Sequence, residues 1–341
     1  MRRSFLSMSV KCAVLGLSAA LLVPSAMAAS DKDKVTIAVG GKGLFYYLPL
    51  TIAEQRGYFK EEGVNVEIID FAGGSKALQA VVGGSADVVS GAYEHTIKLQ
   101  SKKQYFTAFV QQARAPQIVL AVSTKTMANY KGIADLKGKK IGVTAPGSST
   151  NMVASFVLDA GGVKPSDVSF IGVGAGAGAV AAMKSGQIDA ISNLDPVIST
   201  LEKDGAIKVV TDTRKMDATR KVFGGDMPAG SLYAPEDFIK KYPKATQALT
   251  NAIVKANRWI AKASADDVLK AVPASYHLGD PALYKATFLN VKEAMSPDGV
   301  ISPAGAETAL KALAAFDPKF DPKTIELKRT YTNQFVEKAP K

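Results

Sequence analysis

The chain has few of the residues that build disulfides, metal centres and catalytic triads. Its 341 residues include one cysteine, Cys12, and two histidines, His95 and His277. A single cysteine excludes an intrachain disulfide. The histidines have neither a cysteine partner nor the H-x-x-x-H spacing of a metal site, and no G-x-S-x-G motif of a hydrolase accompanies them. We therefore expect no metal, no cofactor and no catalytic residue, and so not an enzyme.

The N-terminus has the pattern of a secretory signal peptide. Arg2 and Arg3 precede an apolar run at residues 13–23, and Ala26-Met27-Ala28 supplies the small residues of a cleavage site. The run is too short for a permanent membrane anchor, and no run of membrane-spanning length follows it. We expect residues 1–28 to be removed and the protein to be exported to the periplasm. The start also resembles a twin-arginine signal, so both the general and the twin-arginine export routes stay open.

The charge balance is basic, at +11, and removal of residues 1–28 takes away only three of the 42 basic residues and no acid. A basic protein favours acidic partners. The lysines are scattered, however, and no nucleic-acid motif appears, so we expect a solvated basic surface, a monomer and no nucleic-acid partner.

An internal repeat dominates the middle of the chain. Residues 66–90 align without gaps with residues 168–192 at an offset of 102. Each copy reads as strand, glycine-rich turn, short helix, G-x-x-D and a second strand, which predicts two α/β lobes with parallel sheets. Asp87 and Asp189 begin the last strand of each copy, and we expect them to share a role in the fold.

The stretches between the copies predict the domain organisation. Residues 114–122 and 221–226 are extended, with proline or glycine punctuation, and we interpret them as two crossings between the lobes. Lobe 1 is then residues 29–116 together with 221–341, and lobe 2 is the inserted segment 117–220. A long helix is expected within residues 235–263, with Leu249, Ala252, Ile253, Ala256 and Ile260 as its buried stripe.

Several motifs resemble one family in their order and spacing. They are residues 47–66 (YLPLTIAEQRGYFKEEGVNV), 84–87 (GSAD), 135–143 (DLKGKKIGV), 185–189 (SGQID) and 195–196 (DP). Nearly the whole chain after the signal resembles the nitrate/sulfonate/taurine group of ABC-transporter substrate-binding proteins. The resemblance implies a two-lobed periplasmic-binding-protein fold (type II, Venus flytrap), with each sheet flanked by helices. It also implies closure on one small ligand, which is delivered to an inner-membrane permease with its ATPase.

A ligand would lie beyond the carboxyl ends of the strands of both lobes. The candidate ligand-binding residues in these loops and crossings are Phe45, Tyr46, Gly74, Ser75, Tyr93, Arg114, Ser148, Ser149, Thr150, Gly174, Asn193 and Asp195.

The ligand itself is predicted from the chemistry of these loops. Ser148 to Thr150 open a helix, whose first N–H groups and dipole favour an anion, and Lys42, Lys76 and Arg114 add positive charge. Phe45, Tyr46 and Tyr93 suggest an apolar tail. The best prediction is an organosulfonate, to which the resemblance also points.

Two alternatives stay open. A flat ring, either a pyrimidine-type thiamine precursor or an aromatic carboxylate, would stack on the tyrosines, with Glu94 or Asp195 accepting its N–H groups. A more remote alternative is an NAD-dependent enzyme, because residues 172–177 satisfy G-x-G-x-x-A. That turn follows the second strand of its repeat, whereas the dinucleotide fingerprint belongs after the first.

Overall fold

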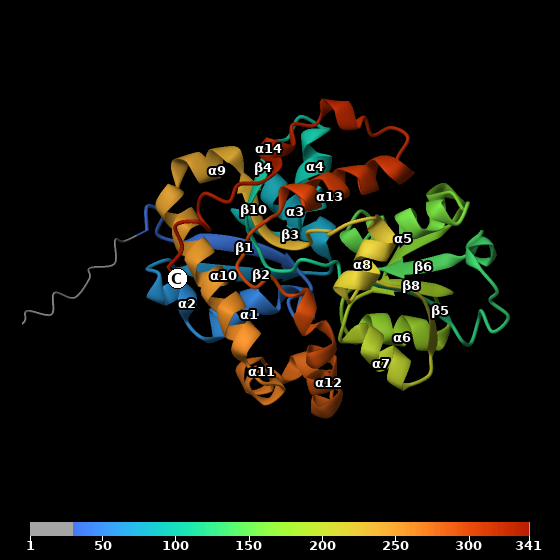
Figure 1. Ribbon diagram of the computed structural model, residues 1–341. Coiled ribbons are helices and arrows are strands. Elements are labelled where there is room, and N and C mark those ends of the chain that lie inside the picture. Colours follow the sequence, from blue (N-terminus) through green and yellow to red (C-terminus); the bar gives the residue numbers. More distant parts are fainter. Residues whose placement is uncertain (1–29, 341) are drawn as a thin grey trace, which may run out of the picture.

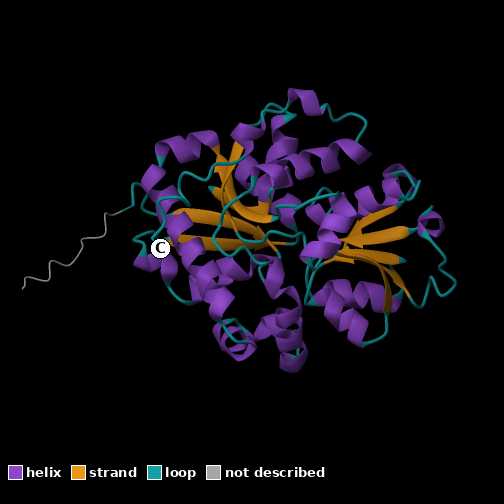
Figure 2. Cartoon of the chain, viewed as in Figure 1, coloured by secondary structure: helices purple, strands orange, loops and turns teal. Residues whose placement is uncertain are grey.

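The computed structural model describes residues 30–340, and Figure 1 shows them as two lobes side by side. The expected signal peptide and Cys12 lie outside the described residues. Each lobe contains one five-stranded sheet with helices on both of its faces (Figure 2). The predicted two-lobed fold is therefore confirmed.

The sheet of lobe 1 has the strand order β2-β1-β3-β10-β4. Its strands are β1 (Val35–Gly40), β2 (Val66–Phe71), β3 (Val88–Ala92), β4 (Phe106–Gln111) and β10 (Gly230–Pro235). The sheet of lobe 2 has the order β7-β6-β8-β5-β9. Its strands are β5 (Val119–Ser123), β6 (Lys140–Val143), β7 (Ser169–Gly172), β8 (Ala190–Asn193) and β9 (Ile207–Asp212).

The prediction of wholly parallel sheets was wrong for both lobes. In lobe 1, β1 runs parallel to β2 and β3, but β10 is antiparallel to β3 and β4. In lobe 2, β6 is parallel to β7 and β8, whereas β5 is antiparallel to β8 and β9. The antiparallel strand has the same cause in both sheets: β5 and β10 each enter directly from the other lobe, and so run from the cleft outwards.

Helices cover the sheets in both lobes. Lobe 1 has α1 (Leu48–Gln55), α2 (Tyr58–Glu61), α3 (Gly74–Val82), α4 (Glu94–Gln100), α9 (Glu236–Lys241), α10 (Pro243–Lys262), α11 (Ala265–Ala271), α12 (Pro281–Val291), α13 (Pro303–Phe316) and α14 (Leu327–Thr330). Lobe 2 has α5 (Ser149–Ala160), α6 (Ala177–Ser185), α7 (Val197–Lys203) and α8 (Met216–Phe223). The predicted apolar stripe of α10 is buried, as expected. Within residues 30–340, no helix is long and apolar enough to cross a membrane.

The two copies of the repeat contain the same pair of hydrogen bonds between an aspartate and the first strand of the lobe. The Asp87 carboxylate accepts from the Thr36 backbone N–H at 2.9 Å, and the Asp189 carboxylate accepts from the Lys140 N–H at 3.0 Å. Each aspartate also donates its own N–H to the carbonyl of that same partner. These bonds tie the start of the third strand to the first strand of each lobe, which confirms the shared role expected for the two aspartates.

Two crossings join the lobes and are bonded to one another. The backbone groups of Ala113 bond to Gly230 and Ala229 near lobe 1, and the Thr213 hydroxyl donates to the Ile118 carbonyl at 2.7 Å near lobe 2. The second crossing is not extended throughout as expected, because α8 occupies residues 216–223. The boundaries at residues 116/117 and 220/221 stay predictions.

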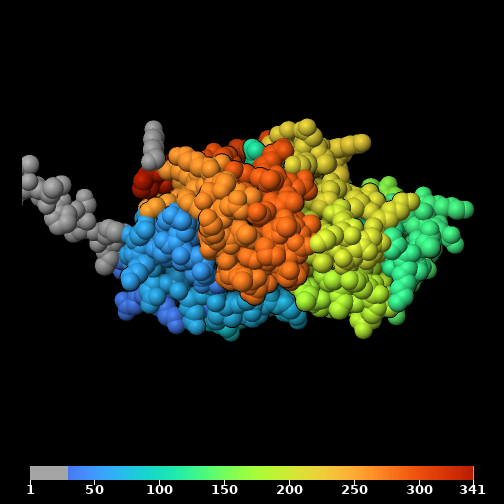
Figure 3. Space-filling view, turned by 90° about the horizontal axis from the view of Figure 1, so that it is seen from below, coloured from blue at the N-terminus to red at the C-terminus, as the bar shows by residue number. Residues whose placement is uncertain are grey.

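The lobes also meet away from the crossings. Figure 3 shows the orange segment that includes α12 lying against the yellow-green surface of lobe 2. At this seam Lys203 of α7 forms an ion pair with Asp280, which caps α12. Residues at or just after the carboxyl ends of β1, β3, β6 and β8 line one small cavity between the lobes.

Candidate ligand-binding site

A small cavity of about 10 Å³ lies between the lobes, with room for about one water-sized group. Its lining comes from the carboxyl ends of strands in both sheets, as the fold predicts. The lining residues are Gly40, Leu44, Tyr46, Tyr47, Gly74, Ala92, His95, Thr144, Ser148, Ser149, Thr150 and Leu194. No lysine or arginine is among these residues, so any negative charge here would be held by dipoles and hydroxyls.

Lobe 2 contributes the start of α5. Gly147, with φ of 84°, makes the turn after β6, and Ser148 takes the extended N-cap conformation. The Asn151 N–H donates to the Ser148 carbonyl at 2.9 Å, which leaves the N–H groups of Ser149 and Thr150 at the start of this twelve-residue helix. The helix dipole adds positive potential there. Ser149 and Thr150 line the cavity at this end. This is a favourable position for an anion.

The three hydroxyls of this helix start do different things. Ser148 makes no capping bond; its oxygen accepts from the Ser75 N–H at 2.9 Å, across the seam. The Thr150 oxygen contacts the Thr144 hydroxyl at 2.9 Å and accepts from the Thr144 N–H at 3.1 Å. Ser149 makes neither of these bonds; its hydroxyl interacts instead with the Tyr46 phenol of lobe 1. That all three residues bind the ligand stays a prediction, and among their side chains we place most weight on Ser149.

Lobe 1 faces α5 with neutral polar groups around Gly74. A methyl group added at Gly74 would lie 3.5 Å from His95 Cε1, 3.7 Å from the Tyr47 hydroxyl and 4.0 Å from Ser148 Oγ. Tyr46 packs edge-on to Tyr47 at 4.9 Å between ring centroids. Gly74 thus leaves open the space on which these side chains converge.

Burial disfavours the charged forms of these groups. Burial, followed by Lys98, lowers the pKa of His95 to about 4, and its Nδ1 lies 2.8 Å from the Tyr233 hydroxyl. Burial raises the pKa of the neighbouring Glu94 to about 7, although Lys98 opposes the shift. Burial and Glu94 both raise the pKa of Tyr46, so its phenol is a hydrogen-bond donor at neutral pH.

The lobes touch directly around the cavity. Ser75 Oγ donates to the Pro146 carbonyl at 2.9 Å, and the Phe45 N–H donates to the Asp195 carbonyl at 3.1 Å. A methyl group at Gly73 would lie 2.8 Å from the Ala145 Cβ and 2.9 Å from its nitrogen. The glycine therefore permits a backbone-to-backbone approach that no other residue allows. Ser75, a predicted ligand residue, bonds the lobes together here.

Several predicted residues point away from the cavity. The Phe45 ring stacks on Tyr284 of α12 at 4.3 Å, and the Tyr93 hydroxyl bonds to Thr330 at 2.6 Å inside lobe 1. Arg114 donates to the Glu293 carbonyl at 3.0 Å. Two of the expected cations are also placed elsewhere: Lys42 bonds to Glu54 at 2.7 Å, and Lys76 is exposed on α3. Neither the apolar wall nor the cationic clamp predicted from the sequence forms at this cavity.

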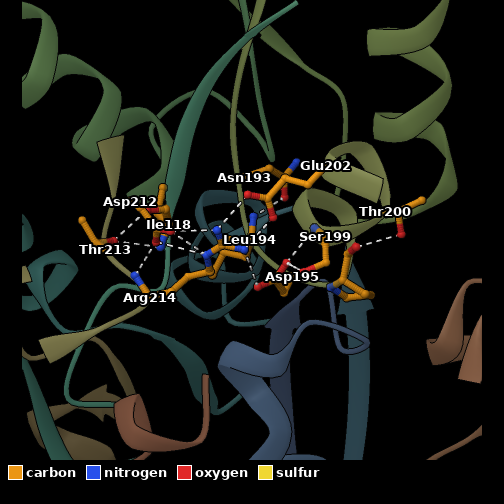
Figure 4. A network of polar contacts seen from close by, with 11 residues as sticks. Ile118, Asn193, Leu194, Asp195, Ser199, Thr200, Glu202, Asp212, Thr213 and Arg214 are labelled. Carbon is orange, nitrogen blue, oxygen red and sulfur yellow. Dashed lines mark hydrogen bonds and ion pairs between the residues drawn. The ribbon is translucent and has the colours of Figure 1, made fainter. Parts of the chain in front are cut away.

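The predicted residues after β7 and β8 belong to the framework of lobe 2. Asn193 donates to the Gly174 carbonyl at 3.1 Å, and its own oxygen accepts from the Leu194 N–H. Asp195 accepts two bonds from Ser199 and pairs with Arg214, at 3.4 Å (Figure 4). These side chains shape the loop that carries Leu194 to the cavity.

Sequence reasoning missed several lining residues. Tyr47, His95, Thr144 and Leu194 were not among the predicted ligand residues, although all follow strands whose ends were recognised. His95 was considered only as a metal ligand or as part of a catalytic triad. Its place after Ala92, at the carboxyl end of β3, was the signal that would have assigned it to the cleft.

The geometry and strand order define the two-lobed fold of periplasmic binding proteins. A model of the NMT1-like family matches residues 29–272, and the chain belongs to this family. A solved protein from Bordetella bronchiseptica RB50 is 63% identical, with a TM-score of 0.89, over 90% of this chain and 96% of that one.

Two further likenesses carry ligand names. The bicarbonate-binding protein CmpA of Synechococcus sp. is 26% identical over 69% of this chain and 56% of its own length. The alkanesulfonate-binding protein SsuA of Xanthomonas axonopodis pv. citri, solved with MOPS, shares the fold, with a TM-score of 0.67 and 18% identity over 89% of this chain and all of that one. An enzyme also matches: the Saccharomyces cerevisiae 4-amino-5-hydroxymethyl-2-methylpyrimidine phosphate synthase is 24% identical over 67% of both chains.

Proposed function

We propose that this protein is the substrate-binding component of an ABC importer. It captures a small anion between its lobes in the periplasm, as a monomer, and presents it to an inner-membrane permease with its ATPase. The expected signal peptide supports this location, and the names of the binding proteins in its family support the transport role.

The start of α5 is the observation that carries the proposal. Its N–H groups and the Ser149 hydroxyl face the Tyr46 and Tyr47 phenols across a small cavity that buried residues mostly line. Buried donors of this kind bind negative charge without a cation, because each N–H or O–H dipole is stronger in a low dielectric. Transport does not require the ligand to react, and the cavity supplies binding groups only.

The size of the ligand follows from which aromatic rings reach the cavity. An organosulfonate was the first choice because Phe45, Tyr46 and Tyr93 would pack on its tail. Only Tyr46 of these lines the cavity, which favours a compact anion or a short sulfonate over a ligand with a long tail. The pyrimidine alternative keeps the Tyr46–Tyr47 pair and the yeast relative in its favour.

Gly74→Ala and Ser149→Ala test the anion site. The new methyl group of Gly74→Ala fills the cavity at ordinary contact distances, at a helix position where alanine is favoured over glycine. Ser149→Ala removes one donor to a charged group. We expect each to weaken anion binding about tenfold or more, with the melting temperature of the ligand-free protein unchanged or higher. Isothermal titration with sulfonates, nitrate, hydrogencarbonate and carboxylates, chosen from a thermal-shift panel that includes pyrimidines, measures this.

Gly132→Ala is the matched control, because a methyl group there meets open space on an extended backbone. It should leave affinity unchanged. If a neutral or cationic ring stabilises the protein and no anion does, the proposal of anion transport is wrong.

A further inference from the structure

A second compartment adjoins the small cavity. It measures about 80 Å³ and shares His95 and Ser148 with its neighbour. Three helices enclose it: α13 of lobe 1 packs on both α4 of the same lobe and α5 of lobe 2. Leu313 and Phe316 of α13 form its apolar side. A ligand held at the start of α5 therefore has this compartment directly beside it.

The α5 side of the compartment is already satisfied. Asn151 accepts from the Gly147 N–H at 2.9 Å and donates to Ser155 at 3.3 Å, and Ser148 bonds to Ser75 across the seam. These side chains already have hydrogen-bond partners within the protein and do not require one from a ligand.

The α4 side is not satisfied. Glu94 and His95 are each only 3% exposed, and Glu94 Oε1 has no hydrogen-bond partner among the residues that the structure describes. Lys98, one helical turn on, makes no ion pair with Glu94 among the residues that the structure describes. A carboxylate oxygen in such a place is an acceptor that requires a donor.

We propose that Glu94 determines specificity by accepting a hydrogen bond from an O–H or N–H that the ligand carries beside its negative charge. The substrate class is then compact anions with a donor of their own, such as hydrogencarbonate or a short hydroxy- or amino-substituted sulfonate or carboxylate. This rests on the proposed capture of an anion at α5.

The same carboxyl group selects against anions without a donor. It would repel such an ion and keep its own oxygen unpartnered, and a site built around a ligand donor discriminates strongly against the analogue that lacks it. A water molecule filling the compartment would satisfy Oε1 for any anion and give no such discrimination. The two cases differ in a measurable ratio of affinities.

Two matched pairs of probes measure that ratio. Hydrogencarbonate and nitrate are both planar, singly charged and three-oxygen anions, and only the first has an O–H. Hydroxyethanesulfonate and ethanesulfonate differ in the same way. Titrations at one fixed, mildly alkaline pH should show the donor-bearing member of at least one pair binding tenfold or more tightly to the wild type. Glu94→Gln should bring that ratio towards one, by weakening the donor-bearing anion and strengthening the other.

Glu307→Gln, an exposed change on α13, is the control and should keep the wild-type ratio. Equal affinities within both pairs in the wild type, or a ratio unchanged in Glu94→Gln, would overturn the assignment of Glu94 and leave anion transport standing. The assignment of Glu94 is also overturned if none of the four probes binds. Anion transport is tested separately, by the affinities of the wild type and Gly74→Ala for the wider panel of anions. Equal affinities within both pairs in the wild type overturn the proposal even if Glu94→Gln fails to fold.

Discussion

Tyr93 of lobe 1 and Asp195 of lobe 2 occupy the same position in the two copies of the repeat. Both follow the third strand, and both were predicted to contact the ligand. Instead, Tyr93 bonds to Thr330 within lobe 1 and Asp195 joins the Arg214 cluster within lobe 2. The comparison teaches that the repeat preserves a structural position and leaves recognition to the residues beside it.

Those neighbouring residues differ between the lobes. Glu94 and His95 follow Tyr93, whereas Pro196 and Val197 follow Asp195. Lobe 1 therefore offers acceptors and neutral donors at this edge, and lobe 2 offers its polar groups at the start of α5, after its first strand. The two lobes divide the recognition of one ligand between different loops.

Removing the contacts that hold Tyr93 and Asp195 within their own lobes should produce unequal losses in the free energy of unfolding. The guanidinium of Arg214 is 7% exposed and pairs with Asp195, Glu202 and Asp212. Arg214→Ala leaves the Asp195 charge buried with only Ser199 as a partner, and should lower the free energy of unfolding by about 3–5 kcal/mol. Tyr93→Phe loses one hydrogen bond, worth about 1 kcal/mol. Urea denaturation of the ligand-free protein measures both.

Arg220→Ala controls for the loss of an arginine, because its pairs with Asp217 and Asp226 lie at the surface. We expect no measurable change. Equal losses in the free energy of unfolding for Arg214→Ala and Tyr93→Phe would contradict this prediction. They would mean that the two side chains stabilise the fold equally, despite their different charge and contacts.

The sequence predicted the framework much better than the site. The alignment of residues 66–90 with 168–192 led directly to the lobes, the strand ends and the shared role of Asp87 and Asp189, because these depend on local pattern. The antiparallel strands β5 and β10 escaped prediction, since their direction is set by the crossing from the other lobe.

The differences between the predicted site and the residues that line the cavity have a common physical cause. Periodicity shows that a residue follows a strand, but not whether its side chain turns to the cleft or back into its own lobe. Tyr93 turned back because Thr330, more than two hundred residues later, supplies its partner. Arg114 likewise donates to the Glu293 carbonyl, which lies far away in the sequence, and does not line the cavity. Glu94 and His95 both line the compartment beside α5, where Glu94 Oε1 has no partner among the described residues.

The pH dependence of the free energy of unfolding should reveal the shifted pKa values of Glu94 and His95 in lobe 1. The raised pKa of Glu94, about 7, gives stability that is present below its usual pKa and is lost as pH rises through 7. The lowered pKa of His95, about 4, gives stability that is present at neutral pH and is lost as pH falls through 4. The two slopes oppose one another over the pH window between these values. Each amounts to about 3 kcal/mol at most.

In the wild type, the combined contribution of Glu94 and His95 to the free energy of unfolding should therefore change little with pH in that window. Glu94→Gln should show stability rising with pH, and His95→Gln should show it falling, in urea titrations at a series of pH values. Identical pH profiles for all three proteins would mean that the two groups titrate as they do in the unfolded chain.

The last prediction separates capture by both lobes from binding to one. Gly73 has an extended backbone, with φ of −178°, so alanine costs nothing within lobe 1. Its methyl group would nevertheless lie 2.9 Å from the Ala145 nitrogen, and a backbone atom cannot move aside unless the lobes part. Gly73→Ala should therefore weaken anion binding about tenfold to a hundredfold, the loss expected when one lobe's hydrogen bonds to a charged ligand are no longer made. Its melting temperature without ligand should match that of Gly132→Ala. Small-angle scattering should show the radius of gyration of the wild type falling when the anion is added, while that of Gly73→Ala stays constant. Unchanged affinity in Gly73→Ala would mean that the start of α5 holds the anion alone, and that lobe 1 contributes no contact to the bound state.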